Sequence, residues 1–172
     1  MRKFFITIVL ISTSILCSAQ ITRNIWGLEL GRSNEQQVMT ILKQKGFNPE
    51  MDKGTNSISI KTEDFFMFGG GYWSYASFSF HNGKLYMVHF HNNEYKIPIG
   101  ISEMFMDLNT RIEAKYGKYK RSDSTTTEPV FYDGKTILFF GLGLNGSVNM
   151  IYMQYYDENL WEKTHESADN EL

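Results

Sequence analysis

Cysteine is almost absent from this 172-residue chain, and its single copy, Cys17, lies in the first apolar stretch. Thiol catalysis and cysteine-ligated metal sites are therefore excluded downstream of that stretch. An excess of basic charge is also lacking, because 17 Lys and Arg residues face 19 Asp and Glu residues. Such a chain has no net positive charge with which to neutralise phosphate groups, so no nucleic-acid partner is expected. Its 42% hydrophobic and 15% aromatic residues are typical of a folded domain.

No apolar run reaches the roughly 20 residues that a membrane-spanning helix needs. The most apolar stretch, residues 4–16, follows Arg2 and Lys3 and precedes small residues that end at Ala19. That arrangement is the pattern of a secretory signal peptide. We therefore predict that residues 1–19 are a signal peptide, and that the protein is exported to the periplasm or the cell exterior without spanning a membrane.

Two other interpretations of the first residues stay open, a retained apolar anchor and lipid attachment at Cys17. Leu16 precedes Cys17 where a lipoprotein signal normally has a small residue, which argues against lipidation. The Ala19-Gln20 junction resembles secreted proteins of the Bacteroidetes. Loss of residues 1–19 would leave no cysteine and a formal charge of −4. Such a protein must be held together by its hydrophobic core, not by disulfides.

An internal repeat organises the rest of the chain. Residues 28–33, Leu-Glu-Leu-Gly-Arg-Ser, return as Ile-Pro-Ile-Gly-Ile-Ser at residues 97–102, and a helical pattern follows each copy. The first helix is expected to be capped by Ser33 with Gln36, and to stop at Gly46 in the left-handed conformation. The second is expected to stop in the same way at Gly117. Its apolar stripe consists of Ile101, Met104, Phe105, Leu108 and Ile112.

Strand patterns follow each helix. They are separated by Asn82-Gly83, Asp133-Gly134 and Asn145-Gly146, which are strong signals for tight hairpin turns. The expected strands cover residues 57–61, 64–68, 74–81, 84–92, 129–132, 135–142 and 147–156. The predicted fold is α+β, with two tandem units that each contain one helix and a three- or four-stranded antiparallel sheet, and with the helices on one sheet face. The units are predicted at residues 20–95 and 96–161, followed by a polar acidic tail at 162–172 that frays beyond Trp161.

Several of these motifs resemble those of a known family of exported proteins. The pattern runs through Ile25-Trp26-Gly27, Leu30-Gly31, Ser33 and Lys45-Gly46-Phe47, and ends in the hairpin around Asn82-Gly83. It resembles the β-lactamase-inhibitor-protein-like fold and the related single-unit domain of small outer-membrane assembly lipoproteins. The resemblance implies action through protein contacts and no chemistry. It covers residues 25–156, and the lipid-attachment motif of the lipoprotein relatives is absent.

Four tyrosines are the first candidates for a binding surface. Pairing across the predicted hairpins sets Phe80 opposite Leu85 and Phe140 opposite Ile151, on the core side of the sheet. Phe139 is expected on the reverse side. Tyr75, Tyr86, Tyr152 and Tyr156 then face solvent or a partner, and tyrosine is a residue that protein interfaces favour. The alternative is that these rings fill the join between two sheets or support the tail.

A second aromatic candidate is Tyr72-Trp73, which follows three glycines at residues 69–71. Together with Tyr75, these rings could form a mobile stacking surface for a sugar or peptide. The alternative is a glycine-rich bulge whose Trp73 returns to the core. The glycines do not predict a phosphate site, because no helix begins there.

His89 and His91 form a His-x-His pattern on one strand, a spacing compatible with one Zn²⁺. His81, Glu94 and Asp64 are the only nearby candidates for a third ligand. A metal hydrolase is thus one hypothesis, and ordinary strand histidines are the other. No serine lies in a nucleophile-elbow motif, so no catalytic residue is assigned.

Ser124 lies in Asp123-Ser124-Thr125, which resembles an acceptor motif for protein O-glycosylation in the Bacteroidetes. A solvated loop explains the same residues. The sequence as a whole favours an exported, cofactor-free, non-enzymatic module that binds another exported or envelope protein. A carbohydrate or peptide binder is the alternative, and the metal hydrolase is third.

Overall fold

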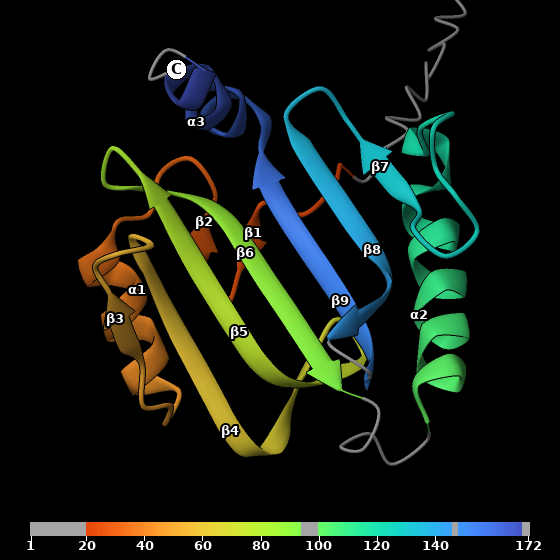
Figure 1. The fold of residues 1–172 in the computed structure, drawn as a ribbon, viewed down its shortest axis with the longest axis horizontal. Helices are drawn as coiled ribbons and strands as arrows, with labels where there is room; N and C mark the ends of the chain where they lie inside the picture. Colours follow the sequence, from red (N-terminus) through yellow and green to blue (C-terminus); the bar gives the residue numbers. More distant parts are fainter. Residues whose placement is uncertain (1–19, 94–99, 146–147, 170–172) are drawn as a thin grey trace, which may run out of the picture.

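The computed structural model describes residues 20–93, 100–145 and 148–169, which form an α+β fold with three α-helices and a seven-stranded antiparallel sheet. The order of strands in the sheet is β3-β4-β5-β6-β9-β8-β7 (Figure 1). These strands are β3 (Glu50–Asp52), β4 (Ser57–Phe68), β5 (Gly71–His81), β6 (Lys84–Asn93), β7 (Val130–Tyr132), β8 (Thr136–Asn145) and β9 (Val148–Asp157). Two shorter strands, β1 (Asn24–Ile25) and β2 (Leu28–Glu29), form a separate hairpin.

The antiparallel prediction is confirmed, and the strands of both halves of the chain join in one continuous sheet. The connection is the antiparallel pair β6 and β9, in which Val88 lies opposite Tyr155 and Phe90 opposite Met153. The last strand of the chain therefore lies in the middle of the sheet. A prediction from local patterns could not place this pair, because its partners are separated by 57 to 69 residues.

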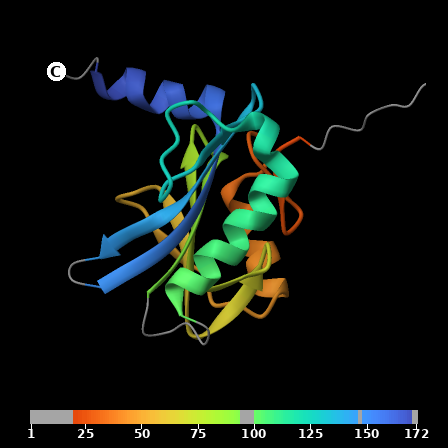
Figure 2. The same ribbon diagram turned by 90° about the vertical axis from the view of Figure 1, so that its right-hand side faces the viewer.

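The helices α1 (Glu35–Gln44) and α2 (Ile101–Tyr116) cover the same face of the sheet (Figure 2). The predicted apolar stripe of α2 is confirmed, since all five of its residues are buried. Phe105 of α2 stacks on Phe140 of β8 with ring centroids 5.0 Å apart. The side chains of β4, β5, β6, β8 and β9 that point toward the helices form one hydrophobic core with them.

A β-bulge at Tyr86 sets which residues of β6 point toward the helices. Phe80 pairs with Leu85 as predicted, whereas Ser79 pairs with Met87 and Phe78 with Val88. The extra residue turns Val88 and Phe90 into the core, and it turns His89 and His91 to the other side. The sequence contains the signal for this bulge, because Leu85 and Val88 are both core residues but are three positions apart.

Two helix ends differ from the prediction. The N-cap of α1 is Asn34, not Ser33, and its side chain and that of Gln37 form a reciprocal capping box. Gly46 has the expected positive φ of +83°. Gly117 instead has a φ of −54° and continues α2 into the 3-10 turn η2 (Gly117–Tyr119), so the expectation of a second left-handed stop is wrong.

The predicted frayed tail is also wrong for the residues that the structure describes. Residues 158–169 form the helix α3 (Glu158–Asp169). Asp157 caps it by accepting a hydrogen bond from the backbone N–H of Leu160 at 3.0 Å. The sequence did not predict this helix because the segment is polar, with only Leu160 and Trp161 strongly apolar.

Candidate functional site

The sheet face opposite α1 and α2, called here the open face, carries a broad polar and aromatic surface. Most of its larger side chains are half-buried: Tyr75, Tyr86, Met87, His89, His91, Phe139, Tyr152, Gln154 and Tyr156. Ile137, opposite Tyr156, is buried. On the packed face, by contrast, Phe90, Phe140 and Met153 expose at most 1% of their surface. The structure thus brings the four predicted tyrosines to one face and leaves part of each accessible.

A row of rings runs across three strands in the middle of the open face. Tyr75 of β5 stacks on His91 of β6, with centroids 4.4 Å apart and an interplanar angle of 21°. The His89 and His91 rings are 5.3 Å apart, and His89 makes an edge contact of 6.5 Å with Tyr152 of β9. Tyr152 in turn donates a hydrogen bond to the carboxylate of Glu128. The row is therefore fixed by packing at both ends.

Gln154 sets the protonation of His89. The hydroxyl of Tyr156 donates to Gln154 Oε1 at 3.0 Å, which leaves the amide nitrogen to donate to His89 Nδ1 at 3.3 Å. An imidazole that accepts at Nδ1 is neutral and carries its hydrogen on Nε2. Burial and, second, the neighbouring His91 lower the pKa of His89 to about 4. Burial likewise lowers the pKa of His91 and raises that of Tyr156 to about 12.

Two nitrogen atoms in this row have no hydrogen-bond partner among the described residues, although each is buried: Nε2 of His89 and Nδ1 of His91. Buried polar atoms normally find partners, and each unmet atom adds a desolvation cost. The sequence singled out both histidines, either as candidate metal ligands or as ordinary strand residues. Within the described ranges, no group of three His, Cys, Asp or Glu side chains could hold a metal ion.

Beside the ring row lies a strip of small side chains. Ser57 and Ser59 of β4 pair with Ser79 and Ser77 of β5. Ser77 also lies opposite His89, and Ser79 opposite Met87. Because serines are short, the strip lies lower than the rings beside it. Sequence reasoning missed this relief, since it arises only when β4, β5 and β6 are aligned.

The helix α3 borders one end of the open face. Trp161 makes an edge contact with Tyr156, with centroids 6.0 Å apart, and packs against His165 at 4.4 Å. Tyr156 contacts Phe139 at 5.5 Å on its other side. Tyr156 therefore supports the C-terminal segment, as one sequence interpretation proposed, and still exposes part of its surface.

The Tyr72-Trp73 surface is not formed. Trp73 is fully buried, donates its indole N–H to the carbonyl of Phe68 at 2.9 Å, and packs against Phe90. Its assignment as a binding residue is thus wrong, and the core alternative is correct. Tyr72 is half-buried and packs on Phe65 at 5.2 Å.

The remaining candidates lie apart from one another. Asp64 is exposed on β4, and His81 lies at the end of β5, where it contacts the side chain of Asn82. Glu94 lies outside the described residues. The Ser124 hydroxyl donates to the carbonyl of Val130 at 3.0 Å and accepts from its N–H at 2.9 Å. These bonds hold the Ser124 side chain against its own loop.

Acid should destabilise the protein through His89. Its folded-state pKa lies below the 6.5 of an ordinary histidine, so the unfolded chain binds more protons between pH 6.5 and 4. The stability present above pH 6.5 is therefore lost toward pH 4. Between pH 6.5 and pH 4, the free energy of unfolding of His89→Gln should fall by about 2 kcal/mol less than that of the wild type. Urea unfolding across that pH range measures the difference. His165→Gln on exposed α3 is the control, and parallel curves for H89Q and wild type would contradict the assignment.

Comparison with family models, curated proteins and solved structures finds no match for this chain. Among residues 20–93, 100–145 and 148–169, no helix is long and apolar enough to cross a membrane.

Proposed function

We propose that the protein is an exported, non-enzymatic module that binds another exported or envelope protein through the open face. The observation that carries the proposal is the row of half-buried rings from Tyr75 to Tyr152. Each of its two central histidines has a buried nitrogen with no partner among the described residues. Rings with polar tips bury much area at little cost in conformational entropy, which suits an interface. A partner that offers acceptor or donor groups would complete the hydrogen bonding of the row.

A protein partner fits this surface better than a small ligand does. The row crosses β5, β6 and β9, and the serine strip extends it to β4, so the surface is broad instead of enclosed. Protein interfaces combine such aromatic anchors with smaller polar contacts. The carbohydrate or peptide alternative depended on Trp73, which is in the core. For the metal hydrolase, the described residues bring two histidines together but no group of three ligands.

The proposed architecture is two tandem units fused into one sheet. In chain order, α1 is followed by β3 to β6, and α2 is followed by β7 to β9. The repeated glycines support this division, because Gly31 has a φ of +80° and Gly100 a φ of +81° just before the two helices. The fusion matters for the function, since the central rings come from β6 of one unit and β9 of the other.

Export is proposed from the signal-peptide pattern of residues 1–19, with cleavage after Ala19. The packing of the described chain begins close to that point. Ile21 is 1% exposed, and its N–H donates to the carboxylate of Asp133 at 2.8 Å. A mature chain that starts at Gln20 would therefore keep this hydrogen bond of Ile21.

A site-specific photo-crosslinking residue tests the binding face. It replaces Ser59 on the open face and, as the matched control, Thr110 on the exposed side of α2. In envelope extract, a protein adduct is expected from position 59 and not from position 110. Tyr152→Ala in the first variant should lower the adduct yield by about tenfold, as for an anchor worth about 1–2 kcal/mol. Equal adducts from both positions, or none from position 59, would contradict the proposal.

A further inference from the structure

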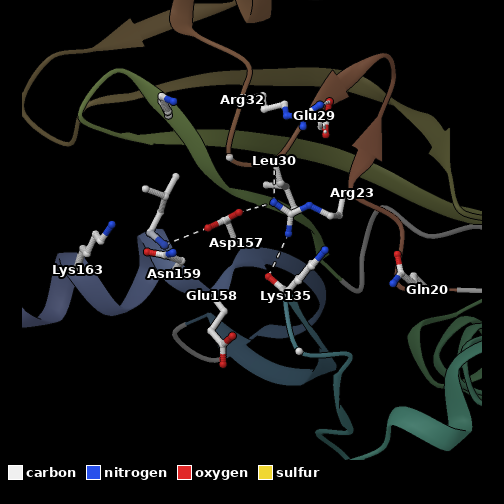
Figure 3. Close-up of a pocket in the computed structure, with 14 residues that line it drawn as sticks. Gln20, Arg23, Glu29, Leu30, Arg32, Lys135, Asp157, Glu158, Asn159 and Lys163 are labelled. Atoms are coloured by element: carbon white, nitrogen blue, oxygen red, sulfur yellow. Dashed lines mark hydrogen bonds and ion pairs between the residues drawn. The ribbon is translucent and has the colours of Figure 1, made fainter.

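A cleft of about 590 Å³ lies at the end of the sheet where β6 and β8 begin and β9 ends. It is distinct from the open face and lies between the β1–β2 segment, the β7–β8 turn and the start of α3 (Figure 3). A cleft of this volume is within the usual range for a small-molecule site.

The floor of the cleft is a fixed network around Arg23. The guanidinium donates to the backbone carbonyls of Leu30 at 2.8 Å and Lys135 at 3.0 Å, and to the Thr136 hydroxyl at 3.1 Å. It also forms an ion pair with Asp157 (Figure 3). The terminal N–H groups of Arg23 are thereby used within the protein. The floor is pre-organised, and Arg23 is a structural residue.

The acidic side chains of the cleft are also engaged. Asp157 accepts from Arg23 with one oxygen and from the N–H of Leu160 with the other. Glu29 pairs with Arg32 at 3.3 Å. Glu158 lies near the hydroxyl of Tyr132 and raises its pKa to about 12. Two of the three carboxylates that line the cleft, Asp157 and Glu29, therefore have a cationic partner.

Three lysines around the same cleft differ in this respect. Lys84 comes from the start of β6, Lys135 from the β7–β8 turn and Lys163 from α3. Within the residues that the structure describes, none of their ammonium groups forms an ion pair. The chain as a whole has two more acidic than basic residues, yet this cleft gathers five cations against three carboxylates. The positive charge is thus concentrated here and is not a property of the whole surface.

We propose that this cleft binds a small anion with two or more negative groups, which Lys84, Lys135 and Lys163 contact together. Three ammonium groups from separate segments suit an anion whose charges are spread over several oxygens. Two glycines, Gly31 and Gly134, line the cleft. A Cβ added at Gly31 would lie 2.6 Å from Asp157 Oδ2. A Cβ added at Gly134 would have no atom within 4 Å of it. The cleft thus stays open beside Lys135.

Pyrophosphate serves as the probe, titrated into the purified protein by calorimetry at constant ionic strength. We expect saturable binding of one equivalent, with a Kd of about 1 mM or tighter. The triple variant K84Q/K135Q/K163Q should weaken it by about tenfold or more. The control K43Q/K53Q/K61Q removes the same charge at exposed lysines elsewhere, and should change the Kd by less than about twofold. Both variants should keep the wild-type melting temperature, because the six lysines are exposed.

Three results would overturn the proposal. The first is the absence of saturable pyrophosphate binding, and the second is an equal loss in both triple variants, which would indicate general screening of charge. The third is binding to vesicles with anionic lipids, sensitive to the cleft lysines, without binding to pyrophosphate. That result would assign the lysines to a membrane surface. None of these measurements needs the protein partner proposed for the open face.

Discussion

Phe90→Ala should lower the free energy of unfolding by about 4 kcal/mol. Phe90 is fully buried, stacks on Phe68 with ring centroids 4.5 Å apart, and contacts Trp26 at 5.7 Å and Trp73 at 5.8 Å. Truncation to alanine removes the buried ring and leaves a cavity among aromatic neighbours that cannot collapse without moving several segments. Urea unfolding measures the loss.

Phe139→Ala is the matched control for this prediction, because it removes the same ring from the open face. Phe139 is half-buried, with a ring contact to Tyr156 at 5.5 Å. We expect a loss of about 1–2 kcal/mol, since less apolar area returns to water and no closed cavity forms. Equal losses for the two variants would mean that both faces of the sheet are core, and would remove the basis for a binding surface.

The strands and their turns could be predicted because their signals are local. Asn82 and Gly83 both have positive φ, at 50° and 70°, as the hairpin prediction requires. The alternation of residues in β8 placed Phe140 on the core face and Phe139 on the other, and that assignment is confirmed. The predicted register between β8 and β9 is wrong by two residues, since Phe140 pairs with Met153 and not with Ile151. A shift of two residues leaves every side chain on its predicted face.

Features that depend on distant partners could not be predicted. The pair β6–β9 brings His89 beside Gln154, and no local pattern links these residues. Trp26 has a positive φ of 57°, unusual for a large side chain, and is held there by Phe47, Phe66 and Phe90. Its conformation is set by packing and not by propensity.

The candidate surface was predicted in part. Sequence patterns placed Tyr75 and Tyr152 on the sheet face away from the helices, because the period of a strand decides the face. They did not reveal that His89 and His91 lie between these tyrosines, each with a buried nitrogen that finds no partner in the described part of the chain. The lysine cleft was missed altogether, since Lys84, Lys135 and Lys163 are far apart in the chain and share no motif.

Arg23 links the fold to the cleft. Its side chain contacts the carbonyls of Leu30 and Lys135, and its partner Asp157 ends β9 and caps α3. The side chain of Asp157 is 11% exposed and that of Arg23 is 25% exposed. A carboxylate in this position depends on its partner, because it cannot be solvated fully when the guanidinium is lost.

Arg23→Met should therefore destabilise the protein by about 3 kcal/mol, as expected when one member of a largely buried ion pair is removed. Arg32→Met, at an ion pair in the same cleft whose side chains are 78% and 41% exposed, should cost no more than about 0.5 kcal/mol. Adding Asp157→Asn to Arg23→Met should recover about 1 kcal/mol, because the amide oxygen can still cap α3 without an uncompensated charge. Urea unfolding of the four proteins gives these differences. Similar losses for Arg23→Met and Arg32→Met, or a further loss in the double variant, would show that the Arg23–Asp157 pair does not hold the N-terminal segment, β9 and α3 together.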